Sequence, residues 1–480
     1  MCGVFDGMRT VSKNQSIKRW FAEGRLWAAF ILAAVVVISS PNVISAQDAP
    51  NAVNVSPDQA RVIARQALAN GDLPLAEGIA TALLSRNPND AEALLLRAVI
   101  SRTKGDFETA GVSARSAYSA SNNPDLKFDA AFLIASLEAK DEHFTRAQIW
   151  LRRADNVAST EARRRAVQNT YREVTRRNPL SVQLAFTMRP SDNINGGSTV
   201  EETGVFGLPG SIDDPIAALE ISGSAVLSYK LAESSKGLTQ AYTSIFARRA
   251  ILESGYESIV PGTSSTEYDY AALTFGLEYR SRPFPDIGVT ALRLGYSAGY
   301  YRNEHFLSAA DITVTQQFRL SDERSFRAGV TLRDEHRFDS PISSTFNTAL
   351  SVDYFPKSSD TLAWSIGTTL TNYNSQANTV NGHRVELRTR LNFKEELLGA
   401  RPDLSLSVAW RDLPDFDYFG TLDNGRQDIS ASVRAGLTFT DISYFGFQPR
   451  AEFGWNRTNS EVDLWDTDSL SLGVTAVSRF

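Results

Sequence analysis

Beyond residue 180 the chain alternates apolar and polar residues with a period of two, and residues 385–393 show this clearly. Such alternation is typical of β-strands that bury one face only. The last 300 residues are therefore predicted to form antiparallel strands. We place about fourteen of them, at 181–189, 216–232, 239–252, 269–282, 288–302, 305–320, 325–335, 345–356, 361–375, 383–398, 403–412, 427–440, 447–458 and 464–480.

The connections between these strands distinguish a membrane barrel from a soluble sandwich. Turns after even-numbered strands are short, as at 233–238 and 321–324, whereas several after odd-numbered strands are long, as at 190–215 and 413–426. Outer-membrane barrels have short periplasmic turns and longer outside loops, and a soluble sandwich has no reason for this asymmetry. Of the 48 aromatic residues, 36 lie in the last 300, where bilayer girdles would use them. Residues 181–480 are therefore predicted to form a transmembrane antiparallel β-barrel.

The N-terminus has the features of a secretory signal. Residues 1–25 carry five basic residues against two acidic ones, and an apolar run of thirteen residues follows at 26–38. That run is shorter than the roughly twenty residues that span a bilayer, so an uncleaved anchor is the weaker alternative. The small-residue stretch 44–46 places cleavage after Ala46. We therefore expect a signal peptide at 1–46 and a protein that leaves the cytoplasm.

Between the signal and the barrel the sequence repeats. The motif Gly-Asp-Leu-Pro-Leu-Ala at 71–76 returns as Gly-Asp-Phe-Glu-Thr-Ala at 105–110, a spacing of 34, and more loosely at 142–147. Thirty-four is the period of the tetratricopeptide (TPR) helix–turn–helix. An ordinary helical bundle is the alternative, and both predict helices. Residues 50–178 are therefore predicted to be a TPR-like periplasmic domain, whose stacked helices offer a concave surface for another protein.

Positive charge concentrates at the end of this helical region. Residues 146–177 hold nine arginines against three acidic residues. A solvated helix face is one explanation. The alternative is a basic collar beside the barrel that receives an acidic client or lipid head groups, with the candidate residues Arg152, Arg153, Arg163, Arg164 and Arg165.

The last strand ends in an aromatic residue. Its apolar positions are Leu470, Leu472, Val474 and Ala476, and Phe480 closes the chain. A terminal strand of this kind is what the barrel insertion machinery of the outer membrane recognises. We therefore expect that machinery and the lipid bilayer to be partners.

Catalytic and nucleic-acid-binding chemistry has little support. The net charge of −6 disfavours nucleic acid, and the single cysteine, Cys2, lies in the predicted signal. The four histidines are scattered, and neither a GxSxG nor a P-loop occurs. Residues 191–202 carry a calcium-loop spacing without the first carboxylate or flanking helices, so a calcium site is disfavoured. We expect no enzyme activity, no cofactor and no metal.

The order of these segments, together with one motif, resembles a known family. The first strand runs into Pro190, Ser191, Asp192, Asn193, Ile194 and Asn195. A signal peptide, a short TPR-like domain and a fourteen-strand barrel with such a motif after its first strand look like the surface lipoprotein assembly modifiers. The resemblance implies an outer-membrane translocon. Such a translocon captures selected periplasmic proteins, either surface lipoproteins or secreted haem-binding-type proteins, and delivers them across the membrane.

Two other functions stay open. TPR domains also precede barrels in exopolysaccharide export, although the short repeat array here counts against that. A general diffusion or structural barrel is the second alternative. Residues 181–480 carry 26 basic and 37 acidic residues, a net of −11, so any conductance is expected to favour cations.

Overall fold

The computed structural model describes residues 55–196, 215–252, 265–283, 288–417 and 425–478. The predicted signal peptide at 1–46 and Phe480 lie outside the described residues. The chain divides into two compact units, Met1–Leu137 and Glu138–Phe480, each described by itself below. The two units meet at Leu137, whereas the sequence pattern changes from helical to strand-like near residue 180. The domain limits 50–178 and 181–480 stay a prediction.

Helices fill the region where the repeats were found, so the predicted TPR-like helical region is confirmed. In chain order they are α2 (Pro57–Ala69), α3 (Leu73–Arg86), α4 (Ala91–Lys104), α5 (Phe107–Ala120), α6 (Pro124–Lys140), α7 (Phe144–Asn156) and α8 (Glu161–Arg177). Among the residues that the structure describes, no helix is long and apolar enough to cross a membrane.

The repeated motif forms the same turn twice. Gly71 and Gly105 adopt left-handed φ angles of 80° and 85°, which glycine tolerates without a steric penalty. The aspartate that follows each glycine caps the next helix, because Asp72 accepts a hydrogen bond from Leu75 N and Asp106 accepts one from Thr109 N. Buried small residues such as Ala76 then let successive helices approach closely. The 34-residue spacing therefore repeats a helical hairpin.

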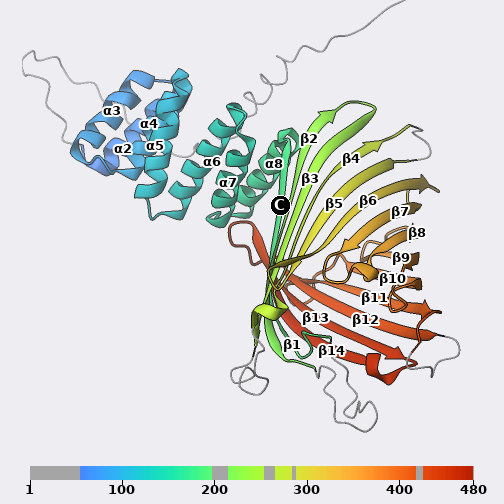
Figure 1. The fold of residues 1–480 in the computed structure, drawn as a ribbon. Helices are drawn as coiled ribbons and strands as arrows, with labels where there is room; N and C mark the ends of the chain where they lie inside the picture. Colours follow the sequence, from blue (N-terminus) through green and yellow to red (C-terminus); the bar gives the residue numbers. More distant parts are fainter. Residues whose placement is uncertain (1–54, 197–214, 253–264, 284–287, 418–424, 479–480) are drawn as a thin grey trace, which may run out of the picture. The chain divides into compact units, whose positions relative to one another are not determined.

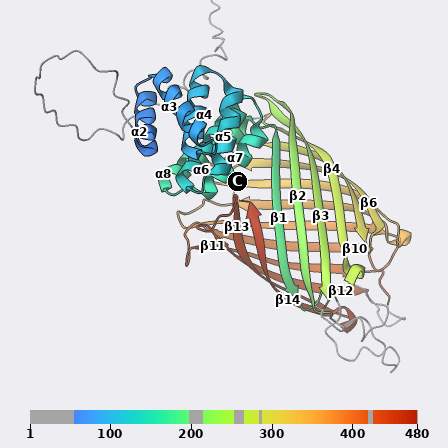
Figure 2. The same cartoon turned by 90° about the vertical axis from the view of Figure 1, so that its left-hand side faces the viewer.

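The second unit contains a closed barrel, which confirms the predicted antiparallel structure of about fourteen strands (Figure 1). Its strands are β1 (Leu180–Ser191), β2 (Ala218–Glu233), β3 (Gly237–Leu252), β4 (Tyr270–Ser281), β5 (Thr290–Tyr301), β6 (Glu304–Arg319), β7 (Ser325–Arg337), β8 (Thr345–Phe355), β9 (Leu362–Ser375), β10 (Gly382–Phe393), β11 (Ala400–Leu413), β12 (Arg426–Phe439), β13 (Phe447–Ser460) and β14 (Thr467–Ser478). Each strand pairs with its neighbours in sequence, and β1 pairs with β14. Figure 2 shows β13, β14, β1 and β2 side by side at this closure.

The strands turn their apolar residues outward. On β14 the side chains of Leu470, Leu472 and Val474 are about half exposed or more, at 49 %, 65 % and 54 %. Exposed apolar residues recur at alternate positions of the other strands, for example Leu273, Phe275 and Leu277 on β4. This arrangement suits hydrocarbon, where closure leaves no backbone edge unpaired. The barrel is therefore of the outer-membrane type.

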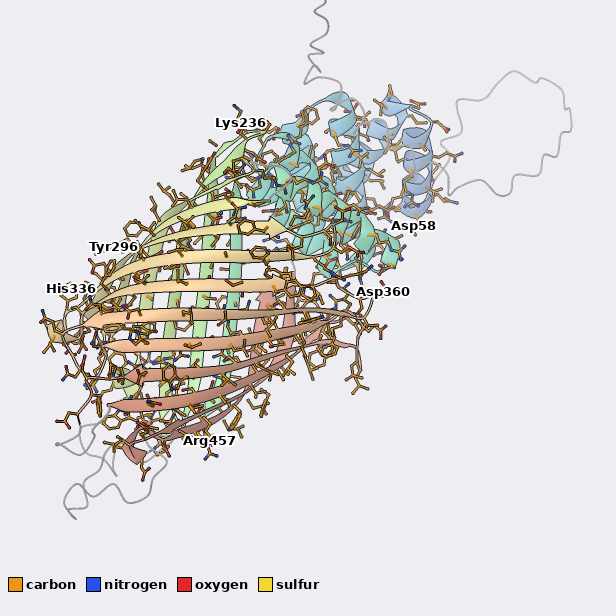
Figure 3. The ribbon with its side chains drawn as sticks, turned by 90° about the vertical axis from the view of Figure 1, so that its right-hand side faces the viewer. Asp58, Lys236, Tyr296, His336, Asp360 and Arg457 are labelled. Atoms are coloured by element: carbon orange, nitrogen blue, oxygen red, sulfur yellow. The ribbon has the colours of Figure 1, made fainter. Side chains whose placement is uncertain are left out.

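The two ends of the barrel differ in their connections. In Figure 3 Lys236 and Asp360, both in short turns, lie at one end, and His336 lies at the other. We call these the short-turn end and the long-loop end. Two of the short turns hold a bulky residue in the left-handed conformation: Leu398 has a φ of 54° and Phe445 has a φ of 49°.

Candidate functional site

The motif at 190–195 lies where β1 leaves the long-loop end. Pro190 interrupts the closing ladder, since β1 pairs with β14 from Ala185 to Met188 and again only at Ser191. Proline has no backbone N–H to donate to a ladder. Beside the interruption, Arg189 donates to both carboxylate oxygens of Glu220 on β2, each at 3.0 Å. The barrel's closure is therefore discontinuous at this motif.

Beyond the interruption, the polar side chains of the motif bind backbone on both flanking strands. Asp192 accepts a hydrogen bond from Leu470 N at 2.9 Å, and Asn193 donates to Asp468 O at 3.3 Å. Asn195 accepts from Ile216 N at 3.0 Å, just ahead of β2. Ser191 accepts from Asn193 N at 3.3 Å. The motif thus ties the end of β1 to β14 and to the segment before β2.

Ile194 gives this tie an apolar anchor. Its side chain packs against Ile216, Ala218, Ala250 and Leu252, four buried residues on and before β2 and β3. Its backbone N–H also donates to Ile216 O at 2.9 Å. These polar and apolar contacts explain why these residue types occur together here, and they give the motif a structural role at the closure.

Arg152 joins the helical region to the barrel. This α7 residue donates to Ser478 Oγ at 3.2 Å and to Tyr171 Oη at 3.3 Å. Its guanidinium also lies over the ring of Phe447, 5.8 Å from the centroid. Phe447 and Ser478 are cross-strand partners at the short-turn ends of β13 and β14. Arg152 therefore contacts the end of the terminal strand.

The other candidate collar residues lie apart from Arg152. Arg153 stacks on Trp150 of its own helix, at 4.3 Å from the ring centroid. Arg163 donates to Ser159 at 3.4 Å, and Arg165 pairs with Glu161 at 3.3 Å. Arg164 is exposed. The five arginines do not share one ligand-sized site.

A second set of contacts holds α8 at the same end of the barrel. Lys230 of β2 donates from Nζ to Arg176 O at 3.0 Å and from its backbone N–H to Pro179 O at 2.8 Å. A cavity of about 520 Å³ separates α8 from the ends of β11, β12 and β13. Its lining consists of Gln168, Tyr171, Arg172, Thr175, Arg401, Thr440 and Gln448. The last helix of the repeat region thus lies beside the mouth of the barrel.

The terminal strand directs its predicted apolar residues away from the lumen. Leu470, Leu472, Val474 and Ala476 alternate with Gly473 and Thr475, and Thr475 pairs with the inward-facing Thr187 of β1. Their Oγ1 atoms lie 2.9 Å apart. The pattern read from the sequence therefore lies on the lipid-facing side of the strand.

The inner wall carries a large excess of positive charge that the sequence analysis did not recognise. Register and alternation place seventeen basic strand residues on the inner face: Arg189, Lys230, Arg248, Arg280, Arg293, Arg319, Arg327, Arg333, Arg337, Arg384, Arg388, Arg390, Arg401, Arg411, Arg426, Arg434 and Arg450. Eleven acidic residues share this face: Glu220, Glu233, Glu278, Glu304, Asp311, Glu335, Asp353, Glu386, Asp403, Asp428 and Glu452.

This distribution corrects the inference of a cation-favouring lumen from the net charge of −11. Residues 181–480 hold 37 acidic residues, but only 14 of them lie in strands. Of the 26 basic residues in that segment, 19 lie in strands. Negative charge therefore gathers in the connections, while the wall is positive. The net charge of residues 181–480 was misleading because it averages the positive wall with the negative connections.

Most acidic residues of the wall form ion pairs with basic residues. Asp353 pairs with Arg388 at 3.3 Å across the intervening strand, where Gly367 leaves room for the contact. Asp403 likewise pairs with Arg450 across Gly436. Within the described chain, ten of the eleven inward acidic residues have a basic partner within ion-pair distance, and Glu304 is the exception. Several arginines are left without a carboxylate.

A cavity lies on this wall at the short-turn end. It measures about 850 Å³ and is bounded by β2 to β7. Its charged lining consists of Glu233, Lys236, Glu278, Arg280, Arg282, Arg293 and Arg327. Basic residues outnumber acidic ones there, which favours anionic ligands.

A buried ion pair organises the opposite end of the lumen. Arg426 binds Asp428 through two hydrogen bonds of 3.0 and 2.8 Å, and both side chains are nearly inaccessible. The guanidinium lies between the rings of Phe416 and Trp465, at 4.9 and 4.4 Å from their centroids.

Among the described residues, no three His, Cys, Asp or Glu side chains gather as a metal site would require.

Part of the barrel is similar to a known protein family. Residues 289–480 match the family described as surface lipoprotein assembly modifier. The resemblance to surface lipoprotein assembly modifiers expected from the sequence is thereby confirmed. The matched residues run from just before β5 to the end of β14. A search of curated proteins found no match.

Solved structures resemble the two regions separately. A yeast Sti1 TPR2B domain in complex with an Hsp70 peptide is 19 % identical over 25 % of this chain and 98 % of its own, with a TM-score of 0.24. Pseudomonas putida OprB is 8 % identical over 65 % of this chain and 96 % of its own, with a TM-score of 0.35. A bacterial polysaccharide outer-membrane secretin is 9 % identical over 62 % and 98 %, with a TM-score of 0.34. Scores this low carry no argument about function.

Proposed function

We propose that this protein is an outer-membrane translocon that captures selected periplasmic proteins through its TPR-like helices and delivers them across the membrane through its barrel. The clients would be surface lipoproteins or secreted haem-binding-type proteins. The family match over residues 289–480 carries the proposal, because that family is named for the assembly of surface lipoproteins. The protein would act without catalysis, as a non-enzymatic assembly factor.

The connections support a periplasmic position for the helical region. Short turns of outer-membrane barrels lie in the periplasm, and α8 contacts the short-turn end through Lys230 and Arg152 of α7 does so through Ser478. The helical region would then lie in the periplasm. A client bound there would be held close to the barrel mouth, and this raises its effective concentration at the entrance.

The residues singled out in the sequence take different parts in this proposal. The arginines of α7 and α8 would form a basic surface beside the mouth, with Arg164 available to acidic clients or head groups. Motif residues 190–195 would keep the interrupted closure together. The terminal strand would be read by the insertion machinery before it pairs with β1.

Two alternatives lead to different observations. If the protein were an exopolysaccharide-export porin, cells lacking its gene would lose polymer from their surface. A diffusion or structural barrel would change small-solute uptake or envelope integrity. Neither alternative has the support of the family match over 289–480.

A comparison of cells with and without the gene tests the proposal. Surface-exposed and released proteins are quantified alongside total protein, and a strain complemented with the full chain is the control. We expect one or a few proteins to leave the surface fraction and accumulate inside. An unchanged set of external proteins would refute the proposal.

A further inference from the structure

Five inward arginines have no carboxylate partner near the short-turn end. They are Arg293, Arg319, Arg327, Arg390 and Arg434, which we call the arginine ring. All five are exposed, and among the described residues none has a carboxylate within ion-pair distance. Each lies within the first or last six residues of its strand at that end. Their positive charge is therefore available to a ligand in the lumen.

One part of the ring is a row on three neighbouring strands. Arg390 of β10 pairs with Ser405 of β11, and Ser405 pairs with Arg434 of β12. Two strand spacings separate the two arginines by about 10 Å at the backbone. Long side chains can close this gap from both sides toward the small serine. The row can therefore offer two guanidinium groups to one extended ligand.

The other part of the ring lies on β5 to β7. Arg293 stacks on Tyr242 at 4.0 Å from the ring centroid, and Arg327 stacks on Phe355 at 5.0 Å. These ring contacts orient both guanidinium groups without neutralising them. Both arginines line the cavity of about 850 Å³. The wall thus presents positive charge on two separate arcs of strands.

The chemistry of guanidinium selects the ligand. Arginine presents planar paired donors that match a carboxylate, and its charge does not depend on pH in the accessible range. A small anion would reach only part of a ring spread over β5–β7 and β10–β12. Carboxylates at alternate positions of an extended polypeptide are about 7 Å apart, and long arginine side chains whose backbones are about 10 Å apart can reach two of them.

We propose that the arginine ring is a binding site for Asp- and Glu-rich segments of an extended polypeptide at the entrance of the lumen. The inference rests on the proposed function for the choice of polypeptide over another polyanion. It gives the lumen a task in selecting clients. Acidic segments would bind here and then meet the acid-rich connections of the far end, which favour their release from the wall.

Peptide binding to the purified full-length protein tests this site. The probe is a short fluorescent peptide rich in Asp and Glu, and its anisotropy is followed in zwitterionic detergent at low salt. A Lys-rich peptide of equal length and a uronic-acid polysaccharide serve as comparison ligands. We expect the acidic peptide to bind, and R390Q/R434Q to weaken its binding by about tenfold or more.

The chain offers a matched control. Arg249 and Arg457 are the two basic strand residues on the outward face, so R249Q/R457Q removes the same charge from the other side of the wall. This variant should bind like the wild type. R293Q/R327Q provides an independent test should R390Q/R434Q fail to fold, which heat-modifiable gel mobility would reveal.

Three results would overturn the proposal. They are an equal effect of the inward and outward double variants, equal binding of the Lys-rich peptide, and tighter binding of the polysaccharide per carboxylate. Client delivery in cells separates this inference from the proposed function. Loss of peptide binding with normal delivery would refute the ring's role alone, whereas unchanged external proteins in the deletion strain would refute the translocon.

Discussion

The Arg152 guanidinium on α7 donates a hydrogen bond to the Ser478 hydroxyl, 3.2 Å away at the end of the terminal strand. The same guanidinium lies over Phe447 on the neighbouring strand. A residue of the helical region thus contacts both β13 and β14 beside the barrel's closure. This contact links α7 to the strand pair next to the closure between β1 and β14.

Replacing Arg152 should weaken the barrel. R152A removes the hydrogen bond to Ser478 and the ring contact, and we expect a loss of about 1 kcal/mol. The measurement is the temperature at which the barrel loses its compact gel mobility in detergent. R153A on the same helix is the control, because Arg153 stacks on Trp150 instead. Equal shifts for the two variants would contradict the coupling.

The buried pair of Arg426 and Asp428 should show strong non-additivity. R426A leaves the Asp428 carboxylate buried without its partner, which costs roughly 3–5 kcal/mol. R426A/D428A removes both charges and should be less destabilised than R426A alone. The midpoint of denaturant-induced unfolding in micelles reports the difference. A double variant as unstable as the sum of the single variants would disprove the account of this pair.

Leu398 is expected to limit stability. It has a φ of 54° and is 94 % exposed in a tight turn where asparagine is preferred. L398N should therefore stabilise the barrel by about 1 kcal/mol, because asparagine tolerates the left-handed conformation better. L397N changes the adjacent exposed residue and should give no such gain. A lower unfolding temperature for L398N would be inconsistent with backbone strain at this turn.

The cap of α5 should depend on pH. Hydrogen bonds from the hydroxyl and backbone N–H of Thr109 lower the pKa of Asp106. Because the folded pKa lies below the unfolded one, the stabilisation is present above about pH 4 and is lost as pH falls through the folded value. Amide exchange in the first turn of α5, corrected for intrinsic rates, should accelerate at acid pH. In D106N this acceleration should be absent.

Much of the fold could be predicted because lipid and lumen impose opposite residue types on alternate positions. On β10, Val385, Leu387, Leu391 and Phe393 face lipid, whereas Arg384, Glu386, Arg388 and Arg390 face the lumen, so period two is visible in the sequence. The glycine and aspartate pairs at 71–72 and 105–106 specify turns locally. Both signals depend on near neighbours in the chain.

The arginine ring was missed although its residues were in view. Arg390 of the ring and its paired neighbours Arg384 and Arg388 occupy polar positions of the alternation, which already places them in the lumen. Their significance depends on which carboxylates pair across strands, as Asp353 does with Arg388 over Gly367. Pairing between non-adjacent strands follows from register. Without register, only the misleading net charge was accessible.

The central claim is that a polypeptide passes through the lumen beside the arginine ring. A photo-crosslinking amino acid at Ser405, between Arg390 and Arg434, tests it in living cells. Matched positions are Leu406, the next residue on the outward face, and Leu472, on the outward face at the closing seam. The account predicts crosslinks to a client polypeptide from Ser405 and none from Leu406 or Leu472. Crosslinks from Leu472 with none from Ser405 would contradict it and place the route at the seam.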